Sequence, residues 1–312
     1  MTVFKTGTYT DLMVRYSRAA CIACFFMAAG ALVGAQAVRR TVYVSVTDKS
    51  GNAVLDVAPS AFVVRENKVA REVLEVALAD EPLQIALLVD NSQASEPHIR
   101  DYREALSAFI TVVTSDNPSP ANGKHQIAII SLADRPTILR DYTSDQVQLL
   151  KSAQSIFAMP GSGAYLLDGI METSHGVVKR TTARPVFVAI FPDASSETSY
   201  RTYDAVLDAL KRSGASLHVV KIGGSMNTSR DRSIVLDEGT RTTGGRYEDL
   251  LVSSALTVRL KQIATDLTHQ YRVTYARPQS LRPPEKFEVS VTKPGLTVRG
   301  TAAREERPQA AR

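Results

Sequence analysis

Three strongly apolar runs in the middle of the chain set the strongest limit on its fold. They are Ile85–Val89, Gln126–Leu132 and Pro185–Phe191. A strand made almost wholly of apolar residues is buried on both faces, as in a parallel sheet covered by helices. Segments with apolar residues at helical spacing lie between and after the runs, and we expect helices near residues 97–113, 147–157, 164–178, 203–210 and 255–267. The pattern predicts an α/β fold, a doubly wound and mostly parallel open sheet.

Alternating apolar and polar residues at both ends of the chain predict half-buried strands instead. They are Thr41–Thr47, Phe62–Glu66, Val73–Ala77, Tyr271–Tyr275, Phe287–Val291 and Leu296–Arg299. We expect the two sets to pack together as a small β companion domain. The expected division is then an N-terminal β unit over 38–80, the α/β domain over 81–268, C-terminal strands over 269–304 and a disordered tail over 305–312.

The first 37 residues have the three parts of a secretory signal peptide. Arg15 and Arg18 precede an apolar run over 19–33, and the small residues Ala35 and Ala37 follow it. The run is shorter than the about 20 residues that span a bilayer. We therefore expect export to the periplasm or beyond the cell, cleavage after Ala37, and no membrane span in the mature chain. The alternative is a buried N-terminal helix.

Composition argues against several functions of the mature chain. Both cysteines, Cys21 and Cys24, lie in the leader, so the mature chain offers no thiolate nucleophile and no disulfide. The formal charge of +5 falls to +3 without the leader, and the basic residues do not cluster with aromatic ones. We therefore expect no nucleic-acid partner. The five histidines lack metal-ligand spacing, and no glycine-rich phosphate motif is present, so nucleotide binding is not expected either.

Two of the buried runs end in an aspartate. Asp90 is followed by Asn91 and Ser92, and Asp193 follows Pro192. In open α/β sheets, ligands bind beyond the carboxyl ends of the strands. Carboxylate and hydroxyl oxygens are hard ligands that suit Mg²⁺, Mn²⁺ or Ca²⁺. The alternative is that both aspartates only cap the turns that follow their strands.

In their order and spacing, these segments resemble the von Willebrand factor type A domain. From about Val38 to Ala303, the chain is similar to a bacterial family of exported proteins with a type A-related core. The segments that carry the resemblance are Thr47-Asp48-Lys49-Ser50-Gly51, Leu87-Leu88-Val89-Asp90-Asn91-Ser92, Phe191-Pro192-Asp193, Thr243-Gly244-Gly245-Arg246-Tyr247 and the strand Tyr271–Tyr275.

The resemblance implies a metal-ion-dependent adhesion site at the strand ends. In type A domains this site takes an Asp-x-Ser-x-Ser turn, a threonine from a second loop and an aspartate from a third. Asp90 and Ser92 match the first two positions of the turn, and Asp193 matches the third-loop aspartate.

Two hydroxyl ligands of that pattern are missing. Ala94 stands where the second serine belongs, and Ala164 stands where the threonine belongs. Ser95 and Ser162 lie close enough in sequence to be candidate replacements. Because Mg²⁺ requires a nearly ideal octahedron of oxygens, we expect at most weak binding of Mg²⁺, Mn²⁺ or Ca²⁺.

The resemblance implies an exported, non-catalytic module for protein binding or adhesion, with a degenerate metal site and an unidentified protein partner. The alternative is a metal-free structural or assembly scaffold. A metal-dependent hydrolase that uses Asp90 and Asp193 ranks last, because the sequence offers no visible general base and no second-metal ligand set.

Overall fold

The computed structural model describes residues 37–115, 123–180, 182, 184–224, 229–279, 284 and 286–303. The chain divides into two compact units, and the larger one, Arg39–Ala276 with Pro283–Arg312, contains nearly all residues of the sheets described below. The expected signal peptide, apart from Ala37, and the expected tail lie outside the described residues.

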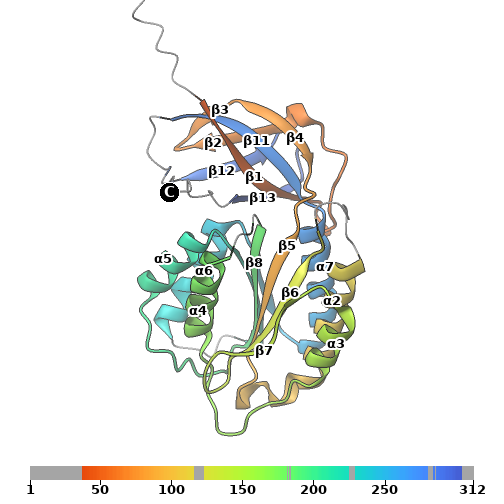
Figure 1. The fold of residues 1–312 in the computed structure, drawn as a ribbon, viewed down its shortest axis with the longest axis vertical. Helices are drawn as coiled ribbons and strands as arrows, with labels where there is room; N and C mark the ends of the chain where they lie inside the picture. The colour runs from red at the N-terminus through yellow and green to blue at the C-terminus, as the bar shows by residue number, and fades with distance from the viewer. Residues whose placement is uncertain are drawn as a thin grey trace, which may run out of the picture. The chain divides into compact units, whose positions relative to one another are not determined.

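A six-stranded sheet forms the centre of the α/β domain (Figure 1). Its strands are β5 (Leu83–Val89), β6 (Gln126–Ser131), β7 (Thr137–Thr143), β8 (Arg184–Pro192), β9 (Ser216–Ile222) and β10 (Tyr247–Leu250). They lie in the order β10-β9-β8-β5-β6-β7, and every neighbouring pair is parallel except β6 and β7. The doubly wound, mostly parallel sheet predicted from the sequence is thereby confirmed.

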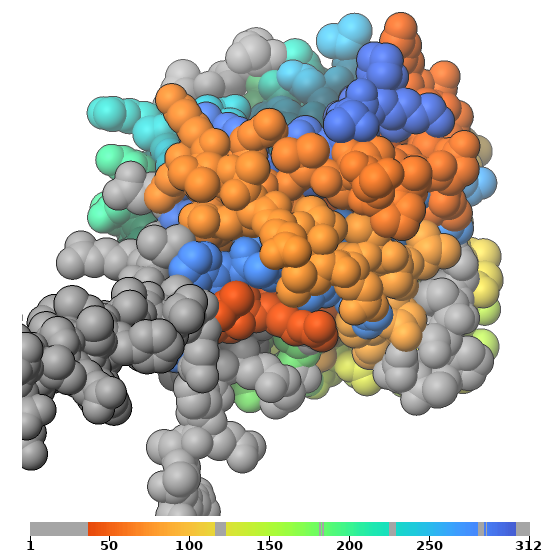
Figure 2. Space-filling model, turned by 90° about the horizontal axis from the view of Figure 1, so that it is seen from above, coloured from red at the N-terminus to blue at the C-terminus, as the bar shows by residue number. Residues whose placement is uncertain are grey.

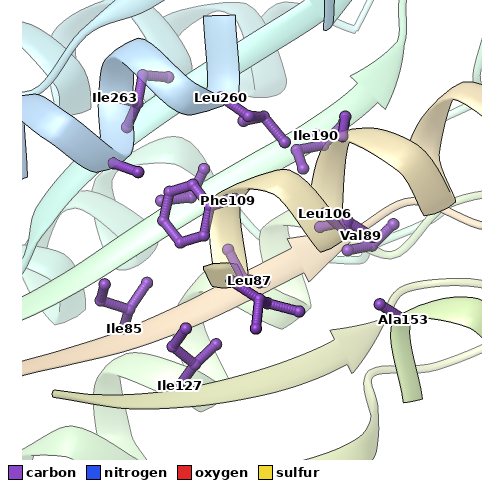
Figure 3. Packing of buried hydrophobic residues seen from close by; sticks show 14 of the residues in the cluster. Ile85, Leu87, Val89, Leu106, Phe109, Ile127, Ala153, Ile190, Leu260 and Ile263 are labelled. Atoms are coloured by element: carbon purple, nitrogen blue, oxygen red, sulfur yellow. The ribbon is translucent and has the colours of Figure 1, made fainter. Parts of the chain in front are cut away.

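Helices cover both faces of this sheet, which explains why its central strands are apolar throughout. One face carries α4 (Leu166–Val178), α5 (Tyr203–Ser213) and α6 (Arg230–Thr243). The other carries α2 (Ile99–Ser115), α3 (Gln146–Gln154) and α7 (Leu256–Thr268). Figure 3 shows Phe109 of α2 and Ile263 of α7 packed over Ile85 and Leu87 of β5, all fully buried. Among the described residues, no helix is long and apolar enough to cross a bilayer.

Three elements of this domain were not expected from the sequence. They are β7, α6 and β10. Strand β7 is largely exposed, so it lacks a buried pattern, and it runs antiparallel to β6 at the edge of the sheet. Helix α6 has few apolar residues and packs through a narrow stripe that includes Val235 and Leu236. A further difference precedes α2, where the 3-10 helix η2 (Gln93–His98) contains Pro97 and α2 itself begins at Ile99.

Strands from both ends of the chain form two smaller sheets. Their order is β13-β1-β11-β4 in one and β12-β2-β3 in the other. The strands are β1 (Ala37–Thr47), β2 (Phe62–Glu66), β3 (Val69–Arg71), β4 (Val73–Leu78), β11 (Tyr271–Pro278), β12 (Phe287–Val291) and β13 (Thr297–Ala302). Antiparallel pairing joins β1 to β13, β4 to β11, and β2 to both β12 and β3. In Figure 2 the orange surface of the N-terminal strands adjoins the blue surface of the C-terminal ones.

Two chain segments connect these small sheets to the α/β domain, and a buried arginine binds both. The guanidinium of Arg184 donates to the carbonyl of Glu81, between β4 and β5, at 2.7 Å. It also donates to the carbonyl of Leu267 at 2.8 Å and to Oε1 of Gln270 at 2.9 Å, where α7 leads into β11. Gln270 in turn donates to Oγ of Ser45 in β1 at 3.1 Å. The start of β8 is thereby fixed to both connections.

The segment Thr243–Arg246, which links α6 to β10, has a packing role. Gly244 ends α6 with a φ of +74°, in the left-handed region that glycine adopts without strain. A Cβ at Gly244 would collide with the carbonyl of Gly300 in β13, and one at Gly245 would collide with the carbonyl of Leu217 in β9. Both positions therefore require glycine because another backbone approaches closely.

Candidate strand-end site

Asp90 lies at the carboxyl end of β5 and is completely buried. Its Oδ1 accepts a hydrogen bond from the backbone N–H of Ser92 at 2.8 Å, as in the turn that caps many strand ends. Its Oδ2 is buried and has no hydrogen-bond partner among the described residues. Burial raises the pKa of Asp90, while hydrogen bonds from Ser195 and Ser92 and the charge of Arg232 act against that rise.

The two candidate replacement hydroxyls are bonded elsewhere. Oγ of Ser95 donates to the backbone carbonyl of Asp90 at 2.7 Å, and Oγ of Ser162 donates to the carbonyl of Met159 at 2.8 Å. Ala164 is buried, and its backbone bonds to Ser196 and Thr198 of the third loop. The second loop therefore joins the third through main-chain contacts and presents no hydroxyl at the threonine position.

Asp193, at the end of β8, lies beside a buried cation. The Nη2 atom of Arg232, from the first turn of α6, is 3.8 Å from Oδ1 of Asp193, and Nζ of Lys221 is 4.0 Å from the same oxygen. Arg232 is 2% exposed and its guanidinium lies over the ring of Phe191 at 5.1 Å. The charge of Arg232 also interacts with the carboxyl groups of Asp90 and Glu197. One guanidinium therefore lies close enough to three carboxyl groups to attract each of them.

Arg232 also holds the third loop through its backbone. Its Nη1 donates to the carbonyl of Ser195 at 2.7 Å, and its Nη2 donates to the carbonyl of Asp193 at 3.2 Å. The hydroxyl of Ser195 lies 3.2 Å from Oγ of Ser92, so the loops that follow β5 and β8 are in side-chain contact at this edge of the sheet. Sequence reasoning identified Asp90, Ser92 and Asp193 but missed Ser195 and Arg232. The Asp-Ala-Ser spacing 193–195 was a signal for the serine, whereas no motif pointed to the arginine.

A divalent cation does not fit this arrangement well. Among the described residues, no group of three or more His, Cys, Asp or Glu side chains is placed to hold a metal. The unpartnered Oδ2 of Asp90 favours an ion, but the buried guanidinium next to Asp193 opposes one. Like charges repel, so the guanidinium beside Asp193 lowers the affinity of this carboxylate for a divalent ion.

The serine hydroxyls of the site lie beside one another and beside the buried Asp90. Oγ of Ser92 is 3.2 Å from Oγ of Ser195, and both side chains lie within hydrogen-bonding reach of the Asp90 carboxyl. His218, on β9, is buried beside Arg299 and Arg246, and burial lowers its pKa to about 3, so it is a neutral side chain within the fold. The arrangement is suited to holding loops together at the strand ends.

No family model matches the chain, and no curated protein matches it. Several solved structures are similar to the chain in fold. A structure of proximal thread matrix protein 1 from the mussel byssus, with zinc in its MIDAS motif, has a TM-score of 0.48 and 11% identity over 67% of this chain, which spans 50% of the mussel protein. The SpRpn10 VWA domain has a TM-score of 0.44 and 15% identity, with 58% of this chain and 97% of that domain covered.

A bacterial example is the vWF domain of the type V pili tip protein Mfa5 from Porphyromonas gingivalis. It has a TM-score of 0.46 and 10% identity, with 60% of this chain and 95% of that domain covered. These similarities concern the fold alone. The sheet order, the helices on both faces and the strand-end turns at Asp90 and Asp193 make this an α/β protein of the von Willebrand factor type A-like class, with additional antiparallel sheets.

Proposed function

We propose that the chain is an exported, non-catalytic protein-binding module with a degenerate metal-ion-dependent adhesion site, and that its partner binds at the carboxyl edge of the six-stranded sheet. The leader-like sequence over 1–37 supports export.

The observation that carries this proposal is the exposure of large side chains on the strand-end loops. Among the described residues, the two most exposed large hydrophobic ones are Tyr200 (95%) and Leu251 (84%). Tyr200 lies between β8 and α5, and Leu251 directly follows β10, so both leave the carboxyl edge of the sheet. Phe157, whose carbonyl accepts a hydrogen bond from the Asn91 side chain, is also exposed there. Exposed aromatic and aliphatic side chains are typical anchors of protein interfaces.

Site-specific photocrosslinking in the source cells would test the location of the partner. A photoreactive residue at Tyr200 or Leu251 should yield one discrete crosslinked protein. The matched control is Val147, which is also strongly exposed (76%) but lies at the opposite edge, because α3 begins where β7 ends beside the start of β6. Adducts of equal yield at all three positions, or adducts only at Val147, would contradict the proposed face.

Two further measurements separate binding from stability and from export. Leu251→Asp should abolish the adduct formed at Tyr200 without lowering the melting temperature, whereas Val147→Asp should leave the adduct unchanged. N-terminal sequencing of the protein recovered outside the cytoplasm should begin at Val38. A chain that keeps Met1 and stays in the cytoplasm would refute export.

A further inference from the structure

We propose that the guanidinium of Arg232 takes the role that a divalent cation has in an intact type A adhesion site. It neutralises the strand-end carboxylates and holds the third loop in place. Three contacts carry this inference: the approach of Nη2 to Oδ1 of Asp193 at 3.8 Å, and the bonds to the carbonyls of Ser195 and Asp193 at 2.7 and 3.2 Å.

The position of Arg232 fits a fixed internal cation better than a surface charge. The residue is 2% exposed, and the ring of Phe191 supports one face of the guanidinium. Ser229 caps α6 by accepting the backbone N–H of Arg232 at 3.4 Å, which fixes the start of the helix. Arginine is the side chain best suited to bind several oxygens from a buried position, because its guanidinium group remains charged and presents five N–H donors.

The missing ligands agree with this role. A metal would need hydroxyls where Ala94 and Ala164 stand, whereas an arginine needs only the carboxyl and carbonyl oxygens that are present. The missing hydroxyls at Ala94 and Ala164 therefore do not destabilise the site if Arg232 supplies the positive charge. Other groups around the guanidinium are Glu197 and Asp90, which are acidic, and Tyr247.

A buried arginine also changes how a partner can be bound. In an intact adhesion site, the metal leaves one position open for an acidic side chain of the partner. Arg232 is buried, so it has no such open position, and binding at this face should not depend on divalent cations. This consequence rests on the proposed function, but the internal cation itself does not, and the test below uses no partner.

Thermal unfolding of the full mature chain in EDTA, and then in millimolar Mg²⁺, Mn²⁺ or Ca²⁺, tests the inference. The wild type should show a shift below about 1 °C with every ion. Arg232→Met should melt at a lower temperature in EDTA and should regain about 5 °C or more with a saturating ion, because the carboxylates then lose the buried counter-charge and only Lys221, at 4.0 Å from Asp193, remains. The gain should be lost in the double variant with Asp90→Asn.

Arg232→Gln is the second variant, since its amide can still donate to the carbonyl of Ser195 and keep the loop folded. Mn²⁺ binding, followed by electron paramagnetic resonance, gives a reading on the wild type that needs no substitution. The inference would be overturned if the wild type bound Mn²⁺ saturably and Asp90→Asn abolished that binding. A folded Arg232→Gln or Arg232→Met chain that gains no cation response would overturn it too.

Discussion

Arg184→Met should destabilise the protein strongly, because Arg184 binds both chain segments that connect the small sheets to the α/β domain. The side chain is 3% exposed and makes three hydrogen bonds, two to backbone carbonyls and one to Oε1 of Gln270. Methionine fills much of the same volume but has no donors. The carbonyls of Glu81 and Leu267 would then lose a charged partner in a buried setting.

The expected loss of unfolding free energy is about 3–5 kcal/mol. Each hydrogen bond to a charged group contributes roughly 1.5–3 kcal/mol, and the variant recovers part of this because it no longer buries a guanidinium. Burial is the main reason that the pKa of Arg184 falls to about 10. In a chain of this size the loss corresponds to a fall in melting temperature of about 10 °C.

Urea unfolding followed by circular dichroism would measure this loss, with Arg100→Met as the control on the exposed surface of α2. The control should stay within about 0.5 kcal/mol of the wild type. Because Gln270 accepts from Arg184, Gln270→Met should cost less in the Arg184→Met background than alone. A loss below about 1 kcal/mol for Arg184→Met, or strictly additive effects in the double variant, would refute the reasoning.

Two other predictions concern β9 and its neighbours. Burial, reinforced by Arg299 and Arg246, lowers the pKa of His218 to about 3, so the unfolded chain takes up this proton first and stability falls as the pH drops below about 6.5. Between pH 7 and pH 5 the wild type should lose about 2 kcal/mol more than His218→Leu in urea unfolding, and equal losses would contradict the buried neutral imidazole. Gly245→Ala should destabilise by more than about 2 kcal/mol, since its Cβ meets the Leu217 backbone, while Gly224→Ala, with open space around it, should be neutral by differential scanning calorimetry.

Local sequence pattern was sufficient for the core of the sheet. Runs such as Ile85–Val89 are apolar at every position because both faces of the strand are buried, and such runs are visible without any knowledge of their neighbours. The alternating pattern also predicted the strands at the chain ends. The expectation that each has one buried face was wrong for β1, because packing on both sides buries every residue from Val42 to Thr47. Elements with weak burial patterns could not be predicted in this way, because β7 is largely exposed and α6 buries only a narrow stripe.

The sequence by itself determined the α/β class, the two strand-end aspartates and the missing hydroxyls at Ala94 and Ala164. Only the tertiary structure decided what lies against those aspartates. Arg232 is 39 residues after Asp193 in the sequence, and no local pattern relates the two. The chain folds α6 back so that its first turn meets the end of β8, and this places a buried guanidinium beside Asp193. Charge interactions of this kind depend on distance and burial, which a one-dimensional pattern does not contain.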